Sequence, residues 1–284
     1  MVINVTKHTP AYWTIGLNNP PLNLYTQAMI NELRNLLTQL ESNEEINVLV
    51  FESMVPDFFM AHVDLMDSGG TLSLEAGPTG LSPWPDFAVR LENAPFVTIA
   101  KIRGRARAVG SEFALAMDMR FASKEKAILA QAEVGFGLFP GGGGMERLPL
   151  LVGRGRALEI ILSADDYDAD TAEKYGWINR SIPDTDLDGF VDKLAHRISG
   201  FDRSAIAATK RFIGKRAGLA QKDDLAETQE AFFEALTSPT PKARITEMFV
   251  NGLQQKSDVE LNLGYHLGKP EIQHIKSKST EQNQ

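Results

Sequence analysis

The sequence feature that most constrains the fold is a change of pattern near residue 186. Before it, short apolar segments that fit strands alternate with amphipathic segments that fit helices. After it, every segment with a clear period has helical spacing, at 186–199, 204–216, 223–237 and 241–255. Strands and helices that alternate over short connections are typical of βαβ units. We therefore expect a mixed α/β body followed by a helical C-terminal part.

The first part of the chain contains a strand, a helix and a second strand in succession. Residues 11–17 are β-branched and aromatic, and an Asn-Asn-Pro-Pro run ends them. Apolar residues then recur at helical spacing from Met29 to Leu40, and residues 46–52 form an apolar run suited to a buried strand. The pattern predicts further strands at 96–103, 119–122, 128–131 and 177–182, and further helices at 86–93, from about Ser111, at 155–163 and at 168–176.

Composition excludes several classes of function. The 284 residues are 43% apolar and carry 37 acidic against 29 basic side chains, a formal charge of −8. Such a balance does not favour broad contact with nucleic acid or with an anionic membrane. The chain has no cysteine, which excludes disulfides, thiolate metal sites and a cysteine nucleophile. No apolar run reaches the roughly 20 residues of a membrane helix, and the first residues resemble neither a secretory nor a transit signal. We expect a soluble, cytoplasmic protein.

Three groups of residues are candidates for ligand binding. The glycine-rich run 140–144 lacks the Lys-Ser/Thr ending of a phosphate-binding P-loop, so we interpret it as a structural turn that opens a helix. The five histidines have no metal-ligand spacing, and we predict no metal site. Lys101, Arg103, Arg105 and Arg107 alternate at strand spacing. They could hold a phosphate-bearing ligand or form salt bridges, and the residues alone do not decide between the two.

Two glutamates are the sharper candidates for chemistry. Glu112 follows Gly110-Ser111 at a predicted helix start, and Glu133 lies 21 residues later, just before the glycine-rich turn. A carboxylate pair can act as acid and base if one member is ionised and the other protonated. Taken alone, Glu112 could equally complement the helix dipole and Glu133 could be a surface acid.

A resemblance to a known family favours a catalytic role for both glutamates. Residues 59–65 (FMAHVDL) are similar to the F-x-A-G-x-D-L segment of the crotonase superfamily, the enoyl-CoA hydratases and isomerases. Residues 104–118 and 131–144 resemble the two segments in which that family carries glutamates. Weaker likenesses at 17–23 and 168–182 complete the set, so five segments occur in the family's order.

The resemblance implies a fold and an assembly. The fold class would be α/β, a crotonase-type spiral of ββα turns with a C-terminal helical region. Residues 1–200 would form the core with the acyl-CoA site, 201–274 a helical oligomerisation region and 275–284 a disordered tail. The family forms homotrimers, often paired into hexamers. Phenylalanines 212, 232, 233 and 249 could supply such an interface, or could instead cap the chain's own core.

The resemblance also implies a site and a reaction. The backbone N–H groups of Val63 and Val109 would polarise a thioester carbonyl, and Glu112 and Glu133 would be the acid and base. The CoA-binding residues implied by motif position are Ala61, His62, Asp64, Leu65, Ala108 and Gly110. The reaction would be hydration of a 2-enoyl-CoA or its reverse, with no cofactor and no metal, because CoA arrives as part of the substrate. The glycine-, serine- and proline-rich segment 66–85 would be a mobile wall of the acyl pocket.

Two alternatives stay open at this point. One is an enoyl-CoA isomerase or another thioester-enolate enzyme of the same scaffold. The other is a non-catalytic acyl-CoA-binding relative, because Ala108-Val109-Gly110 replaces the family's three glycines. A β-branched Val109 would tolerate positive φ poorly. His62 in place of the usual glycine, Arg103 in place of asparagine and Ala132 in place of proline also depart from the pattern and favour a narrower site or an unusual acyl group.

Overall fold

The computed structural model describes residues 1–66 and 75–269 of the chain. Ten strands form two sheets within these residues. The larger sheet has the order β1 (Ile3–Thr9), β2 (Tyr12–Leu17), β3 (Val48–Ser53), β5 (Val97–Ile102), β7 (Met119–Ser123), β10 (Arg180–Ile182). The smaller sheet has the order β4 (Phe58–Met60), β6 (Arg105–Arg107), β8 (Ile128–Ala130), β9 (Tyr167–Asp168). Only the β1–β2 and β8–β9 pairs of these sheets are antiparallel.

The chain moves between the two sheets in a regular way. β3, β5 and β7 lie in the larger sheet, and the strand that follows each of them lies in the smaller one. A helical element follows each of these strand pairs: α2 (Pro83–Asn93), α3 (Val109–Leu115) and the short 3₁₀ helix η1 (Glu133–Phe136). The fold is therefore the expected α/β spiral of ββα turns.

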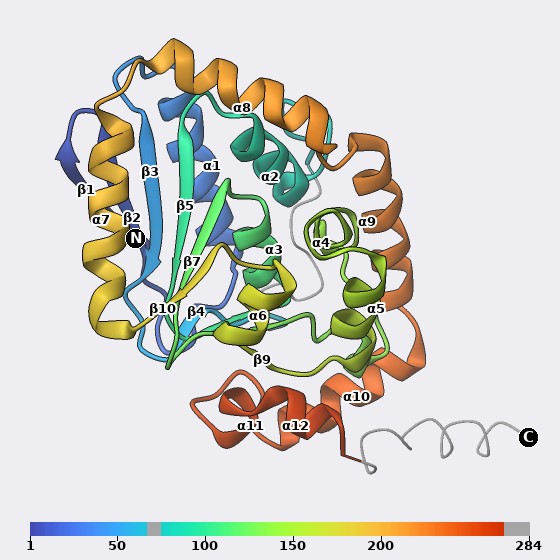
Figure 1. Cartoon of the computed structure of the whole chain (residues 1–284). Helices are drawn as coiled ribbons and strands as arrows, with labels where there is room; N and C mark the ends of the chain where they lie inside the picture. Colours follow the sequence, from blue (N-terminus) through green and yellow to red (C-terminus); the bar gives the residue numbers. More distant parts are fainter. Residues whose placement is uncertain (67–74, 270–284) are drawn as a thin grey trace, which may run out of the picture.

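The larger sheet is covered on both faces (Figure 1). In β3, Val48 and Val50 pack with residues of α7 (Asp184–Ser199), whereas Leu49 and Phe51 pack with residues of α1 (Gln27–Glu41), α2 and α3. Successive residues of a strand point to opposite faces, so a strand buried on both sides needs an apolar residue at every position. This explains the unbroken apolar run in the sequence.

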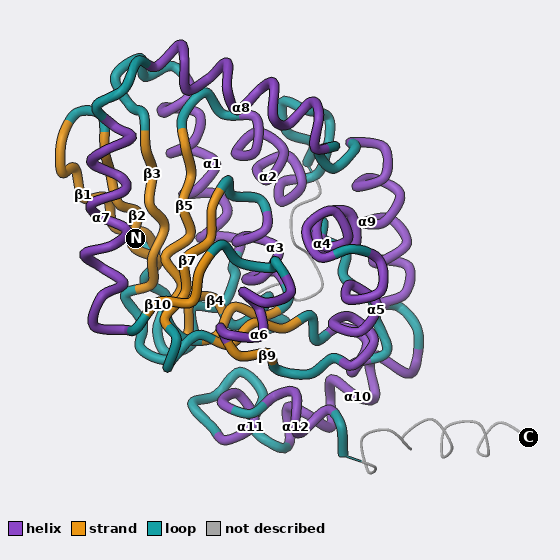
Figure 2. Tube along the Cα trace, in the orientation of Figure 1, coloured by secondary structure: helices purple, strands orange, loops and turns teal. Residues whose placement is uncertain are grey.

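Only helices follow β10 among the described residues (Figure 2). Figure 1 draws α8 (Arg203–Ala217) above α2, and α9 (Lys222–Leu236) to the right of α4 (Gly144–Val152) and α5 (Arg154–Ser163). α10 (Pro239–Val250), α11 (Asp258–Leu261) and α12 (Leu263–Leu267) then return to the smaller sheet, next to η1. α6 (Ala169–Tyr175) precedes β10. No helix of the described ranges is long and apolar enough to cross a membrane.

Several boundaries differ from the sequence prediction. The sequence pattern did not predict the strands β1, β4, β6 and β9 or the helices α11 and α12. β10 covers only the last three residues of the strand expected at 177–182. α2 begins at Pro83 rather than at residue 86, because proline is well accepted in the first turn of a helix. The expected loop at 66–85 lies partly outside the described residues, since 67–74 are not described. The expected tail 275–284 lies wholly outside them.

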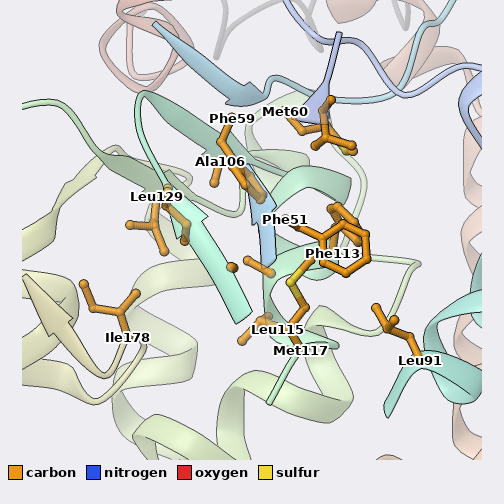
Figure 3. Close-up of a cluster of buried hydrophobic side chains, with 14 of the residues drawn as sticks. Phe51, Phe59, Met60, Leu91, Ala106, Phe113, Leu115, Met117, Leu129 and Ile178 are labelled. Atoms are coloured by element: carbon orange, nitrogen blue, oxygen red, sulfur yellow. The ribbon is translucent and has the colours of Figure 1, made fainter. Parts of the chain in front are cut away.

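An aromatic cluster anchors α3 in the core. The ring of Phe113 is 5.2 Å from that of Phe51, 6.0 Å from Trp84 and 5.9 Å from Phe87, measured between centroids. Phe113 is fully buried, and Figure 3 shows it against Phe51. Edge-to-face and offset aromatic pairs add to the hydrophobic gain of burial. The cluster therefore fixes the helix that carries Glu112.

Replacing Phe113 by alanine tests this anchor. We expect Phe113→Ala to lower the free energy of unfolding by about 3–5 kcal/mol, because the surrounding side chains cannot fill the cavity it leaves. The matched control is Phe201→Ala, since Phe201 is 52% exposed and its loss should cost much less. Chemical denaturation of both variants measures the difference. Equal losses would show that α3 is not held by this cluster.

Candidate active site

A cavity of about 210 Å³ lies between the start of α3, the segment after β4 and helix α9. Val63, Val109, Glu112 and Glu133 all line it. These are the four residues that the sequence assigns to catalysis, and they come from three separate turns of the spiral. The fold thus brings together residues up to 70 positions apart in the chain.

A close backbone contact joins the two elements that carry the valines. A Cβ added to Gly110 would lie 2.1 Å from the carbonyl oxygen of Met60, which is impossible for any other residue at this spacing. Gly110 is in the first turn of α3, and Met60 ends β4. The start of the helix and the segment after the strand can therefore approach closely enough for Val63 and Val109 to share one cavity wall.

The backbone around Val63 directs its N–H group away from the neighbouring segment, which contains Tyr25. Tyr25 and Val63 form a parallel bridge in which the Tyr25 N–H donates to the His62 carbonyl at 2.8 Å and the Asp64 N–H donates to the Tyr25 carbonyl at 2.8 Å. In a trans peptide the N–H points opposite to the preceding C=O. Because Tyr25 holds the His62 carbonyl, the Val63 N–H points to the other side of this segment.

Val109 is the first residue of α3, so its N–H is one of those that no intrahelical carbonyl can accept. The Ala108 carbonyl accepts from the Glu112 N–H at 3.0 Å and so points along the helix. Val109, which as a β-branched residue would tolerate positive φ poorly, does not adopt it. Ala108 adopts positive φ instead, with φ 48° and ψ −124°, a conformation that is strained for any residue with a side chain.

Glu112 is buried against the glycine-rich turn. Its Oε1 accepts from the N–H of Gly142 at 2.8 Å and of Gly144 at 3.0 Å. A Cβ on Gly142 would lie 2.2 Å from Glu112 Oε2, so the turn needs glycine there to reach the carboxylate. Burial raises the pKa of Glu112 from its ordinary value to about 7, although the two N–H groups act in the opposite direction.

Glu133 opens η1 and is only 8% exposed, so the alternative of a surface acid is wrong. Its Oε2 is buried and has no hydrogen-bond partner among the described residues. Burial raises its pKa well above the usual range, and the nearby charge of Glu112 raises it further. Two interacting carboxyl groups in one cavity favour a state in which they share a single negative charge.

The comparisons with known proteins agree with this geometry. The family model for enoyl-CoA hydratase/isomerase matches residues 10–256. The chain belongs to the enoyl-CoA hydratase/isomerase family. The crystal structure of a candidate enoyl-CoA hydratase from Streptomyces avermitilis is 40% identical, covers 94% of this chain and 96% of its own, and superposes with a TM-score of 0.88.

Curated relatives extend the likeness to the family. A short-chain-enoyl-CoA hydratase of Clostridium acetobutylicum is 28% identical over 82% of this chain and 88% of its own. The fatty acid oxidation complex subunit alpha of Vibrio parahaemolyticus is 30% identical over 67% of this chain. The match spans only 28% of that subunit's length, so the chain corresponds to one part of it.

The C-terminal helices supply much of the cavity wall in this family member. Phe232, Phe233 and Leu236 of α9 and Ile245 of α10 line it together with Trp84 of α2. The sequence left open whether Phe232 and Phe233 form an interface or cap the chain's own core, and both line the cavity. The paired phenylalanines are the signal that could have assigned them to the site.

Only some of the residues predicted to bind CoA line the cavity. His62, Leu65 and Ala108 line the cavity, whereas Ala61, Asp64 and Gly110 do not. Residues that the sequence analysis missed include Tyr25, Trp84 and Gln229. Trp84 donates its indole N–H to the Gly142 carbonyl at 2.9 Å and so holds the turn that binds Glu112. Its role depends on a long-range contact, which no local pattern reveals.

The basic strand residues do not form a free phosphate site. Lys101 pairs with Glu52 and Asp188, and Arg103 pairs with Asp184 at 2.7 Å and Asp188 at 2.8 Å. Their charges are therefore used within the chain, as the salt-bridge alternative proposed.

Arg105 and Arg107 also have partners within the chain. Arg105 donates to the Leu261 carbonyl at 2.8 Å, and Arg107 binds Asp166 at 2.6 Å. Among residues 1–66 and 75–269, no group of three or more His, Cys, Asp or Glu side chains could hold a metal ion.

The raised pKa of Glu112 predicts a pH-dependent change in stability. A carboxyl whose folded pKa is raised stabilises the fold at pH values below its unfolded pKa, and this contribution is lost as pH rises through about 7. Glu112→Gln keeps an acceptor for both N–H groups but cannot ionise. Its unfolding free energy relative to the native chain should therefore rise by about 3 kcal/mol between pH 4 and pH 8. Denaturant titrations across this range measure the change, and a constant difference would contradict a buried, raised Glu112.

Proposed function

We propose that this chain hydrates 2-enoyl-CoA thioesters and catalyses the reverse dehydration. The observation that carries the proposal is the pair of buried carboxyl groups, Glu112 and Glu133, which face one cavity whose wall also contains Val63 and Val109. Addition of water to an enoyl thioester needs a base for the water, an acid for Cα and donors for the enolate oxygen. One cavity contains candidates for all three.

The N–H groups of Val63 and Val109 would receive the thioester oxygen. Negative charge develops on that oxygen when the double bond is attacked, and fixed N–H donors stabilise the charge without reorganisation. The first turn of α3 favours an anion because its N–H groups are unpaired there. In other enzymes such a donor contributes about 3–4 kcal/mol to transition-state stabilisation.

The two glutamates would divide acid and base duties according to their environments. Glu112 accepts two backbone N–H groups, which favour its ionised form, so it would orient water and take its proton as the oxygen bonds to Cβ. Burial and the charge of Glu112 oppose ionisation of Glu133. Glu133 would therefore stay protonated and give its proton to Cα as the enolate collapses. One proton enters Glu112 and one leaves Glu133, so the pair is restored by proton exchange with solvent or with each other.

The cavity walls favour an apolar acyl group, because Phe232, Phe233 and Ile245 surround it. Isomerisation of an enoyl-CoA is the second candidate, since the family includes both reactions and a single carboxyl at Glu133 could move a proton between two carbons. The buried state of Glu112 favours hydration, because an isomerase has no need of a second acid. Catalysis needs no metal or redox cofactor in either proposal.

Three further features stay predictions. The residues proposed to contact CoA are Ala61, His62, Asp64, Leu65, Ala108 and Gly110. Residues 1–200 would be the core and 201–274 would also serve assembly into a homotrimer or hexamer. A cytoplasmic location is an expectation from the sequence.

An absorbance assay tests the proposed reaction. We expect the native chain to remove the enoyl thioester absorbance of crotonyl-CoA or of a longer 2-enoyl-CoA. Glu112→Gln and Glu133→Gln should each lower kcat by about 10²–10⁴, because each removes one proton-transfer step. The matched control Glu230→Gln changes an exposed glutamate of α9 and should keep native activity.

A parallel assay with 3-enoyl-CoA separates the two candidates. Hydration that depends on both glutamates supports the proposal. Isomerisation that survives Glu112→Gln, without hydration by the native chain, would replace it with the second candidate. Binding of acyl-CoA with neither reaction would indicate a non-catalytic relative.

A further inference from the structure

His62 occupies a position beside the proposed oxyanion donor, and both of its ring nitrogens have partners. Nδ1 lies 2.9 Å from the Val63 carbonyl oxygen, and Nε2 lies 2.9 Å from Oε1 of Glu260. His62 is 7% exposed and Glu260 is fully buried. The contact joins the segment after β4 to α11, which is 198 residues away along the chain.

The partners of His62 determine its charge. A carbonyl oxygen only accepts hydrogen bonds, so Nδ1 must carry a proton. Glu260 Oε1 also accepts the N–H of Gln254 at 2.6 Å, as expected for an ionised carboxylate. An ionised Glu260 accepts a hydrogen bond from Nε2, so these contacts favour the imidazolium form of the ring. Burial lowers the pKa of His62, but the charge and hydrogen bond of Glu260 outweigh burial and raise it.

Other charges near His62 do not compete for Glu260. Arg107, at the end of β6, is the second charged group that acts on His62, and it lowers the pKa of the imidazolium. Two of its nitrogens bind the carboxylate of Asp166 at 2.7 and 2.6 Å. Its third donates to the Glu260 carbonyl at 2.5 Å. Arg107 therefore fixes the backbone of α11 and leaves the Glu260 side chain to His62.

The His62 side chain holds the peptide group that follows Val63, and the Tyr25 backbone holds the one that precedes it. The Val63 carbonyl accepts from His62 Nδ1 and from the side-chain amide of Gln254 at 3.0 Å. The preceding carbonyl accepts from the Tyr25 N–H. With both flanking peptides held, the direction of the Val63 N–H is fixed before any substrate binds. Preorganisation of this kind is what makes an oxyanion donor effective.

We propose that His62 and Glu260 are positioning residues that aim the Val63 N–H at the thioester oxygen, so that α11 completes the oxyanion hole from the C-terminal end of the chain. The inference rests on the proposed function for the donor role of Val63. It assigns to α11 a part in the reaction, in addition to any part in assembly. The resembled family usually has glycine at the position of His62, so this chain would hold the donor by a different device.

The test compares single and double variants with a control on the same helix. We expect His62→Gln and Glu260→Gln each to lower kcat by about 10- to 100-fold with KM changed less than about threefold, because the donor is misdirected while the cavity stays. The double variant, which removes both charges together, should lose no more than the worse single variant. The control is Asp258→Asn, because Asp258 also pairs with a histidine, His266 at 2.8 Å, but is exposed and outside the cavity.

Two readouts separate positioning from general damage. On the alkaline side, the native kcat should fall both as Glu133 loses its proton and as His62 loses its proton, and His62→Gln should keep only the fall due to Glu133. Butyryl-CoA cannot be hydrated, because it has no double bond, and its thioester carbonyl can be labelled with ¹³C. The carbonyl stretch should move to lower frequency when the thioester binds, and this shift should be smaller in His62→Gln. Thermal unfolding of each variant identifies any single variant that fails to fold. In that case the double variant, which removes both charges together, is assayed in its place.

The outcomes distinguish the two proposals. Native activity with unchanged kcat and carbonyl shift in folded His62→Gln and Glu260→Gln overturns the positioning role and leaves the proposed function intact. A native chain that binds butyryl-CoA with a shifted carbonyl but hydrates nothing overturns the proposed reaction alone. In that case, a smaller shift in His62→Gln still supports the positioning pair.

Discussion

The close approach of Gly110 to the Met60 carbonyl is the contact on which the site depends. It lets the first turn of α3 lie against the end of β4, where any side chain on Gly110 would collide with backbone. Val63 follows β4 and Val109 begins α3, so this contact brings the two residues of the proposed oxyanion hole to one cavity wall. The aromatic cluster around Phe113 holds the same helix from behind. Packing in the core thus determines where the start of α3 lies at the cavity.

The second constraint is electrostatic. Two carboxyl groups lie in a largely apolar cavity, and their ionisation there opposes folding. The fold offsets part of this cost for Glu112 with the N–H groups of the glycine-rich turn, whereas Glu133 Oε2 has no such partner among the described residues. In the proposed reaction, this difference would make Glu112 the base and Glu133 the acid. The proposed proton transfer would use the raised pKa values that this burial produces.

The sequence predicted the repeating units well, because they depend on local patterns. The buried strand at 46–52, the helix from Met29 to Leu40 and the turn before α4 all follow from periodicity and glycine placement. It also identified Glu112 and Glu133, but only through a resemblance, since nothing local distinguishes a buried first-turn glutamate from an exposed one.

What the sequence missed depends on long-range contacts. The His62–Glu260 pair spans 198 residues, and α11 is a single turn with no periodicity to detect. The positive φ at Ala108 rather than Val109 depends on where α3 begins, and helix boundaries are the least predictable part of a pattern. Phe232 and Phe233 were visible as an apolar pair, but their direction required the fold.

The most direct test of the central claim is the fate of the proton delivered to Cα. Crotonyl-CoA would be incubated with the protein in D₂O and the hydrated product examined by NMR at C2. We expect one deuterium at C2 on a single face, because Glu133 would deliver it from one fixed side of the cavity. A product labelled equally on both faces, or no product while both glutamates are intact, would contradict the account.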